Sequence, residues 1–209
     1  MGKSDKRAAT PERLNVLLIG GGGREHALAW RLKKSPSLGD LHITHPQNPG
    51  LAALGRAVDV PVNANEAYRT AQYCDKHKIN LVVIGPEDPL AEGLADALRT
   101  SDRAVFGPNK DGARLEADKA WAKQLMRAAS LPTAESRTFT NAENAIEYLE
   151  TRDTAQVVKA SGLAKGKGVI STYWLDVKSA VVAASDHSGS SDQLGPSKVD
   201  ADEVGAIFV

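Results

Sequence analysis

The architecture of this chain follows from residues 16–27, which read Val16-Leu17-Leu18-Ile19-Gly20-Gly21-Gly22-Gly23-Arg24-Glu25-His26-Ala27. The opening run of leucine and β-branched residues has the length and composition of a strand buried on both faces of a parallel sheet. Four glycines end this strand, and a helical pattern follows them. A strand, a glycine turn and a helix direct backbone N–H groups at an anion, and the helix dipole adds partial positive charge there. The stretch therefore predicts a phosphate-binding turn.

The turn matches neither of two familiar phosphate-binding patterns. G-x-G-x-x-G read from Gly20 requires glycine where Glu25 stands, and G-x-x-x-x-G-K-[ST] fails because no Gly-Lys pair follows. A glycine turn that only reverses the chain is the alternative. We favour the bound phosphate, because four successive glycines exceed what a reversal requires.

Alternating strand and helix patterns continue through the first half of the chain. We expect strands near 15–19, 41–44, 57–62, 80–84 and 104–106, and helices near 24–34, 65–78 and 90–99, the second helix packing through Tyr68, Ala71 and Tyr73. Such alternation predicts a doubly wound parallel sheet that binds ligands at the carboxyl ends of its strands. The loops at 20–26 and 85–89 both follow strands, and we expect them to face one crevice.

The second strand argues against a nicotinamide dinucleotide as ligand. In a dinucleotide-binding fold this strand ends in Asp or Glu, which binds the ribose hydroxyls. Here it runs into His45-Pro46 instead. We therefore disfavour the oxidoreductase interpretation.

A second region begins near Gly107-Pro108. It predicts a helix at 118–129 with an apolar stripe, a strand near 136–139, a helix capped by Asn141, strands at 156–160 and 169–174, and a helix at 176–185. The stripe of the first helix is Trp121, Leu125 and Ala128, and that of the capped helix is Ala145, Ile146 and Leu149. We expect a mobile loop at 188–197 and a strand at 205–209, and we interpret the end of the chain on that apolar strand as a cut.

The loop between the two later strands is rich in glycine and lysine. Residues 162–168 read Gly-Leu-Ala-Lys-Gly-Lys-Gly, and such a loop can close over a polyphosphate, because glycines allow close approach and lysines supply charge. An exposed basic hairpin without a ligand is the alternative. Lys159 shares a strand face with Val157, so on a packed strand it requires a counter-charge, either a nucleotide phosphate or a structural salt bridge.

Composition limits the remaining function classes. Lys plus Arg and Asp plus Glu each number 26, so no charge imbalance indicates nucleic acid or anionic lipid as a partner. No apolar stretch is long enough for a membrane span or a signal segment, and we expect a cytoplasmic protein. The single cysteine, Cys74, is expected to pack within a helix. The five histidines have no metal-ligand spacing, and no Ser-His-Asp or Cys-His arrangement is evident.

Four stretches, taken together, resemble phosphoribosylamine–glycine ligases (glycinamide ribonucleotide synthetases), which are ATP-grasp enzymes. They occur in the family's order between residues 14 and about 170. They are the glycine turn with its following helix (Gly21 to Trp30), Val83-Ile84-Gly85-Pro86-Glu87-Asp88-Pro89-Leu90, Phe106-Gly107-Pro108, and the segment from Val157 to Val169.

This resemblance implies a reaction and a domain plan. In the family, ATP phosphorylates glycine, and the amine of 5-phosphoribosylamine attacks the glycyl phosphate to give glycinamide ribonucleotide, ADP and phosphate in purine biosynthesis. Mg²⁺ accompanies the nucleotide, and we expect its ligands beyond Val209. The implied plan is a disordered lead-in at 1–13, a pre-ATP-grasp parallel α/β phosphoribosylamine-binding domain at 14–107, and the first portion of an α+β ATP-grasp domain at 108–209.

The resemblance also assigns residues to the substrates, with no catalytic residue and no metal ligand assigned in this chain. Phosphoribosylamine would contact three groups of residues: Gly22, Gly23, Arg24, Glu25 and His26; Asn48, Pro49 and Gly50; and Gly85, Pro86 and Glu87. Within the third group, Glu87 would accept hydrogen bonds from the ribose hydroxyls. ATP would contact Lys119, Lys159, Gly162, Gly166, Lys167 and Gly168.

Some residues depart from the family's pattern. Ser161 stands where the family usually has Asp, Asp118 where it usually has Ser, and Lys165 where it usually has Ala. The loop Pro46-Gln47-Asn48-Pro49-Gly50-Leu51 replaces a more usual P-G-N-P-G-T. Two alternatives stay open: another ATP-grasp ligase or carboxylase, and a non-catalytic phosphosugar- or nucleotide-binding module. The sequence leaves open the oligomeric state and any fusion to further pathway enzymes.

Overall fold

The computed structural model describes residues 13–163, 169–173, 175–185 and 207–208. The chain divides into two compact units, residues 1–113 and 114–209, so the division falls within helix α6 (Lys110–Ala117). The domain boundary expected near residue 107 stays a prediction.

The first unit is built on a parallel five-stranded sheet in the order β3-β2-β1-β4-β5. Its strands are β1 (Leu14–Ile19), β2 (Leu38–Ile43), β3 (Arg56–Ala57), β4 (Ile79–Ile84) and β5 (Ala104–Phe106). The order reverses between β1 and β4, and the loops that leave these neighbouring strands flank the crevice where doubly wound sheets bind ligands. The predicted doubly wound parallel fold is therefore confirmed.

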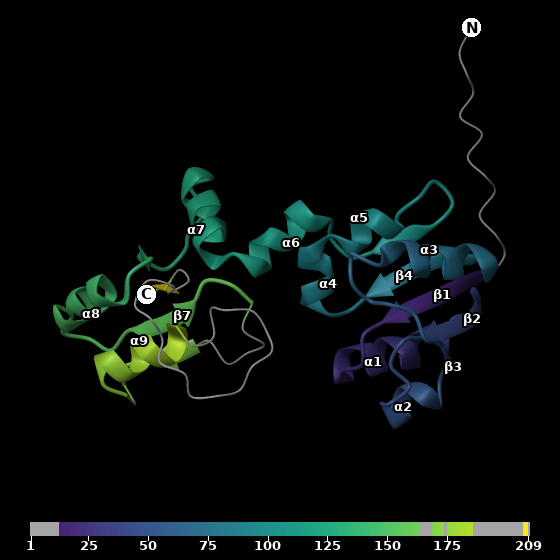
Figure 1. The fold of residues 1–209 in the computed structure, drawn as a ribbon, viewed down its shortest axis with the longest axis horizontal. Helices are drawn as coiled ribbons and strands as arrows, with labels where there is room; N and C mark the ends of the chain where they lie inside the picture. The colour runs from purple at the N-terminus through teal and green to yellow at the C-terminus, as the bar shows by residue number, and fades with distance from the viewer. Residues whose placement is uncertain (1–12, 164–168, 174, 186–206, 209) are drawn as a thin grey trace, which may run out of the picture. The chain divides into compact units, whose positions relative to one another are not determined.

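Helices cover both faces of this sheet, α1 and α2 on one side and α3, α4 and α5 on the other (Figure 1). They are α1 (Gly23–Leu32), α2 (Pro49–Ala52), α3 (Ala67–Lys76), α4 (Glu87–Glu92) and α5 (Leu94–Leu98). Alternate residues of β1 point to opposite faces of the sheet. Leu17 packs with residues of α3, α4 and α5, and Leu18 packs with residues of α1 and α2. Both are fully buried. A continuous apolar strand thus folds as expected for burial on two faces.

Several details of the first unit differ from the sequence predictions. Helix α2 was not predicted, and β2 begins at Leu38 rather than near residue 41. The strand expected at 57–62 shortens to Arg56–Ala57. The helix expected at 90–99 is split in two by Gly93, whose backbone is left-handed (φ 98°) and ends α4. Tyr68, expected to pack, is 63% exposed, because α3 buries the face that carries Ala67, Thr70 and Cys74.

Cys74 packs as predicted. The residue lies on the buried face of α3, and burial raises the pKa of its thiol to about 11. A thiol with so high a pKa is a poor nucleophile. Cys74 therefore contributes to packing.

The second unit contains a four-stranded sheet in the order β6-β9-β7-β8, with antiparallel pairings. Its strands are β6 (Thr138–Phe139), β7 (Val157–Ala160), β8 (Val169–Ser171) and β9 (Ile207–Phe208), and its helices are α7 (Lys119–Ala128), α8 (Ala142–Glu150) and α9 (Val177–Ser185). A small core joins α8 and α9 to the buried residue Val158 of β7. This mixed unit matches the expected α+β portion.

Helix α8 forms as predicted, but the stripe predicted for α7 is wrong. The side chain of Asn141 caps α8 by accepting from Asn144 N–H at 3.1 Å, and Ala145 and Leu149 are buried. In α7 the buried residue is Ala122, and Leu125 is 42% exposed. The helix α6 was not predicted.

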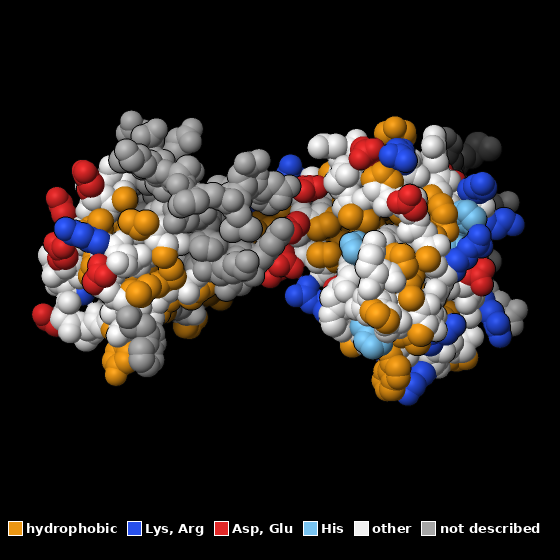
Figure 2. Space-filling model, turned by 60° about the horizontal axis from the view of Figure 1, so that its bottom comes forward, with side chains coloured by type: hydrophobic (Ala, Val, Ile, Leu, Met, Phe, Trp, Pro, Cys, Tyr) orange, Lys and Arg blue, Asp and Glu red, His pale blue; other side chains and the backbone are white. Residues whose placement is uncertain are grey.

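The surface carries charges of both signs. Figure 2 shows Lys or Arg and Asp or Glu side chains on both units, on the face that it presents. This distribution agrees with the formal net charge of +0. In the part of the chain that the structure describes, no helix is long and apolar enough to cross a membrane.

Candidate functional site

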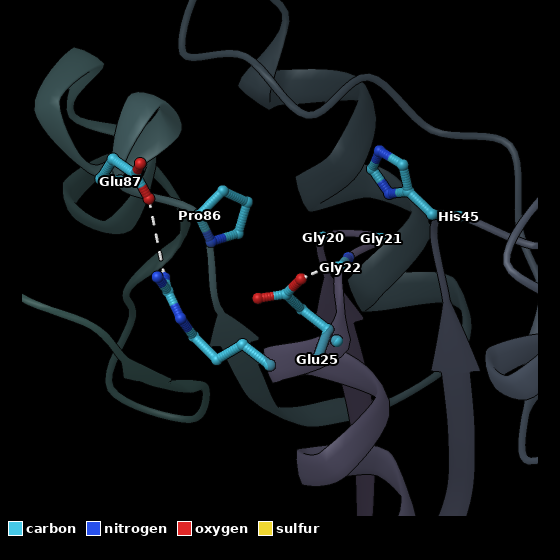
Figure 3. A pocket seen from close by; sticks show the side chains of 9 residues that line it. Gly20, Gly21, Gly22, Glu25, His45, Pro86 and Glu87 are labelled. Atoms are coloured by element: carbon cyan, nitrogen blue, oxygen red, sulfur yellow. Dashed lines mark hydrogen bonds and ion pairs between the residues drawn. The ribbon is translucent and has the colours of Figure 1, made fainter. Parts of the chain in front are cut away.

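A cavity of about 500 Å³ opens at the carboxyl ends of β1, β2 and β4 in the first unit (Figure 3). The glycine turn, the start of α1, the end of β2 and the start of α4 form its walls. The residues that line it are Gly20, Gly21, Gly22, Gly23, Arg24, Glu25, His45, Pro86 and Glu87. The structure therefore brings two loops that are distant in sequence, 20–26 and 85–89, to the same cavity.

Glu25 fills the space between the glycine turn and the segment after β4. Its Oε2 accepts from Gly22 N–H at 2.6 Å, a bond from the third residue of α1 back to the N-cap backbone, and the residue is 4% exposed. A Cβ atom added at Gly85 would overlap Glu25 Oε1 and lie 2.6 Å from Cδ. Glycine at position 85 is therefore required by the close approach of this carboxylate.

Several N–H groups at the start of α1 are left for a ligand. In the described part of the chain, the N–H groups of Gly23, Arg24 and Glu25 donate to no protein acceptor, as expected for the first turn of a helix. Gly22 N–H is taken by Glu25. An anion at this turn would therefore be bound by the first helical N–H groups rather than by Gly22.

Arg24 connects the two walls of the cavity. Its Nη1 donates to Gly85 O at 2.5 Å. The same atom lies 3.6 Å from Glu87 Oε2, the ion pair that a dashed line marks at Glu87 in Figure 3. The guanidinium is largely exposed and the Glu87 carboxylate is partly exposed. One cation and one carboxylate thus face the same opening, a pairing that suits a ligand with both a phosphate and polar hydroxyl or amine groups.

The segment 48–50 supports the glycine turn from behind and is absent from the cavity lining. Asn48 Nδ2 donates to Gly21 O at 2.9 Å, and Asn48 Oδ1 caps α2 by accepting from Gly50 N–H at 3.0 Å. The ring of His26 lies against Gly50, where an added Cβ would be 2.6 Å from Cε1. Contacts of Asn48, Pro49, Gly50 and His26 with substrate stay predictions.

His45 lines the cavity, although the sequence reasoning did not assign it a role. Its Nδ1 lies 2.7 Å from Thr44 Oγ1, and Thr44 Oγ1 accepts from Gly20 N–H at 3.3 Å. Its position directly after β2 could have predicted that His45 lies at the cavity, because all carboxyl ends of the strands in a parallel sheet meet at one edge. The sequence interpretation used His45 only as evidence against a dinucleotide ligand.

The lysines proposed for ATP come together in the second unit. Lys119, the first residue of α7, donates from Nζ to Gly162 O at 2.6 Å and to Ser161 O at 3.3 Å. Burial, followed by the positive charge of Lys159, lowers the pKa of Lys119. Two lysines from separate elements thus lie close enough to repel each other, an arrangement that an anion would stabilise.

Lys159 lies on the more exposed face of β7. It shares that face with Val157, as predicted, but Val157 is 44% exposed, whereas Val158 and Ala160 are fully buried. The side chain of Lys159 is half-buried rather than packed in the core, and its need for a counter-charge stays a prediction.

The two departures at positions 118 and 161 are in contact with each other. Ser161 Oγ donates to Asp118 Oδ1 at 3.4 Å and accepts from Ala120 N–H at 3.1 Å. Asp118 also caps α7 through Trp121 N–H. Although burial opposes it, hydrogen bonds from Trp121 N–H and the Arg114 guanidinium lower the pKa of Asp118. A carboxylate and a hydroxyl therefore pair at the start of α7.

The remaining residues assigned to ATP lie outside the described residues: Gly166, Lys167 and Gly168, together with the departure at Lys165. The expected loop at 188–197 and most of the lead-in at 1–13 also lie outside them. Within the described ranges, no group of three or more His, Cys, Asp or Glu side chains is arranged to hold a metal ion.

Comparison with known protein families matches the chain to two domains in succession. The model described as phosphoribosylglycinamide synthetase, N domain, matches residues 14–116. The model described as phosphoribosylglycinamide synthetase, ATP-grasp (A) domain, matches residues 117–192.

Individual relatives agree with these matches. A phosphoribosylamine–glycine ligase of Nostoc sp. is 44% identical over 171 residues, which is 81% of this chain and 40% of that protein. The trifunctional purine biosynthetic protein adenosine-3 of Chironomus tentans is 44% identical over 74% of this chain and 12% of its own length. The crystal structure of phosphoribosylamine–glycine ligase from Thermotoga maritima superposes with a TM-score of 0.62 at 26% identity, covering 93% of this chain and 43% of that one.

The chain therefore spans about two fifths of the length of the Nostoc ligase that it matches. With both domain models matched in order over residues 14–192, the chain belongs to the phosphoribosylglycinamide synthetase family.

Proposed function

We propose that this chain supplies the phosphoribosylamine site and part of the ATP site of an enzyme that ligates glycine to 5-phosphoribosylamine. The products would be glycinamide ribonucleotide, ADP and phosphate, formed through a glycyl phosphate. The observation that carries the proposal is the convergence of the two family motifs, at 20–26 and at 85–89, on one cavity. The cytoplasmic location and the lack of nucleic-acid and membrane partners stay predictions.

The cavity in the first unit suits a phosphorylated amino sugar. The first N–H groups of α1 and the Arg24 guanidinium offer hydrogen bonds and positive charge to a phosphate. Glu87 would accept from ribose hydroxyls. A volume of about 500 Å³ falls in the range of small-molecule pockets. Holding the amine in place is the main contribution such a site makes to a ligation, since positioning supplies much of the rate.

In the second unit, Lys119 and Lys159 would bind the phosphates of ATP. Burial, followed by the positive charge of Lys159, lowers the pKa of Lys119, and a polyanionic ligand would offset the repulsion between the two lysines. Charge neutralisation by such groups stabilises a transferring phosphoryl group. Mg²⁺ would supply further neutralisation in a complete site, but the described residues do not offer a ligand set for it, and we derive no step through the ion.

Arg24→Met tests the phosphosugar part of the proposal. Removing a charge-assisted phosphate contact costs about 1.5–3 kcal/mol, so the affinity for ribose 5-phosphate should fall roughly ten- to a hundredfold. Titration calorimetry measures this affinity. Arg31→Met is the matched control, because Arg31 lies on the same helix outside the cavity lining. Equal losses in both variants, or no loss in either, would contradict the assignment.

Lys159→Met tests the nucleotide part. The variant keeps the aliphatic stem and removes the charge, so ATP should bind at least tenfold more weakly while adenosine binding stays unchanged. We choose Lys159 because Lys119 also holds the backbone of residues 161 and 162. Lys178→Met, an exposed change on α9, is the control. If ATP and adenosine affinities fell together, Lys159 would be a structural residue.

A further inference from the structure

A second cavity, of about 670 Å³, lies within the second unit and takes no part in the proposed reaction. It is bounded by the segment 131–137, which joins α7 to β6, by the end of α8, and by the residues before β7. The positively charged side chains in its lining are Arg127, Arg137 and Arg152. A cavity with three arginines from three segments calls for a chemical explanation.

This cavity is separate from the residues proposed for ATP. Its lining includes Gln156, which precedes β7, whereas Gly162 follows the other end of that strand. Four extended residues span about 13 Å, so the two groups lie at opposite ends of β7. A ligand in this cavity would leave the ATP residues free.

Two of the guanidiniums lie over one aromatic ring. Arg152 Cζ is 4.2 Å and Arg137 Cζ is 5.0 Å from the centre of the Tyr148 ring. Each contact is favourable alone, but both bring like charges to the same place. Among the described residues, none of the three cavity arginines has a carboxylate within ion-pair distance. With Glu135 as the acidic residue of the lining, the cavity carries a formal charge of about +2.

The wall of the cavity is held in place without a ligand. Lys123 Nζ donates to Thr133 Oγ1 at 2.6 Å and to Ala134 O at 2.7 Å. Arg127 Nη2 donates to Ser136 Oγ at 2.8 Å. The segment 131–137 is therefore fixed to α7, and the arginines line a preformed cavity.

We propose that this cavity binds a small compound that carries a diphosphate or two phosphate groups. Guanidinium groups bind phosphate oxygens in a bidentate manner, and a dianion would balance the excess positive charge over Tyr148. The volume lies within the range for small ligands. An acidic peptide is the rival occupant, and we favour the small compound because the arginines line a cavity of small-molecule size.

Titration of the 209-residue chain with inorganic pyrophosphate at low ionic strength tests the proposal. Arg137→Gln/Arg152→Gln should weaken one class of pyrophosphate binding at least tenfold. Lys159→Met, which changes the residues proposed for ATP, should leave that class unchanged. Lys178→Gln is the control for removal of an exposed positive charge from the same unit. Circular dichroism and urea unfolding establish that each variant is folded.

Four results would overturn the proposal. They are no binding of pyrophosphate to the unchanged chain at millimolar concentration, equal weakening in Lys178→Gln, loss confined to Lys159→Met, and tighter arginine-dependent binding of a polyglutamate peptide than of pyrophosphate. If the double variant does not fold, the single variant Arg152→Gln takes its place under the same criteria. The test is independent of the ligase proposal, because neither ribose 5-phosphate nor ATP is its probe.

Discussion

The substitution Gly85→Ala tests whether Glu25 holds the glycine turn together. The new Cβ would overlap Glu25 Oε1 and cannot move aside, because Gly85 N–H donates to Ile19 O at 3.0 Å at the end of the sheet. The Glu25 carboxylate must therefore rotate away and release Gly22 N–H. The start of α1 would then lose the bond between Glu25 and the N-cap backbone.

The size of the effect follows from the bond that is lost. A hydrogen bond to a charged group contributes about 1.5–3 kcal/mol to stability. Gly22 is exposed, so water replaces part of that bond. Replacing glycine by alanine also lowers the entropy of the unfolded chain, which returns about 0.4–1 kcal/mol. We expect a net loss of about 1 kcal/mol, or roughly 0.3–1 M urea in the unfolding midpoint.

Urea unfolding followed by tryptophan emission measures this loss in the first unit alone. The chain has three tryptophans, and Trp30 is the one in residues 1–113. Replacing Trp121 and Trp174 by Phe makes the emission report that unit. Gly23→Ala is the matched control, because its Cβ would have no heavy atom within 4 Å. We expect the control to be as stable as the unchanged unit or slightly more stable.

Two results would refute this reasoning. The first is a Gly85→Ala unit whose stability is within about 0.5 kcal/mol of the control, the scale of a neutral surface change. The second is additivity with Glu25→Ala. If the clash is the cause, the double variant loses no more stability than Glu25→Ala alone, since no carboxylate remains to be displaced.

Three further predictions concern other parts of the chain. His42 is 2% exposed, and its Nδ1 lies 2.6 Å from Tyr73 Oη. Burial, and after it the charge of His77, lowers the pKa of His42, although the nearby Asp40 opposes this shift. The unfolded state thus binds the proton more readily, so the first unit should lose stability as the pH falls below about 6.5. In His42→Gln this loss of urea midpoint at low pH should disappear. If the midpoint of the variant fell with pH as steeply as that of the unchanged chain, the prediction would be contradicted. Asn141→Ala should cost the second unit about 1 kcal/mol through loss of the α8 cap, whereas Asn141→Asp should cost little. Ser161→Asp should destabilise the second unit by placing two carboxylates together, and adding Asp118→Ser should restore the stability; a double variant no more stable than Ser161→Asp would show that the two positions are independent.

The sheet of the first unit was predictable because its signals are local. Strands β1 and β4 are largely apolar runs that stop at Gly20 and Gly85, so local composition predicts them as strands. Strand β2 begins at Leu38, earlier than predicted, because Gly39 and Asp40 lack that signal. The helix expected at 90–99 shows the limit of such signals. Gly93 occupies a position that a helix tolerates, and only its left-handed backbone divides the segment.

The residues around the cavity were predictable as a group, but the role of Glu25 was not. Two unusual loops after parallel strands had to meet at one edge of the sheet. The capping bond of Glu25 to Gly22 N–H is local, yet the requirement for glycine at position 85 depends on a contact between distant parts of the chain. The sequence of the glycine turn alone therefore predicts more N–H groups available to a ligand than the folded turn offers, because Glu25 accepts from one of them.

The same limitation explains the departures at positions 118 and 161. Considered separately, the two departures leave their effect on the ATP site open, because a carboxylate is missing from one position and a hydroxyl from the other. The structure shows Ser161 Oγ donating to Asp118 Oδ1, so both groups are present with their positions exchanged. The carboxylate now caps α7, where a helix N-terminus stabilises negative charge. Because the pair also holds the first residues of α7 beside Gly162, the exchange preserves the position of Lys119, and we expect the departures to leave nucleotide binding intact.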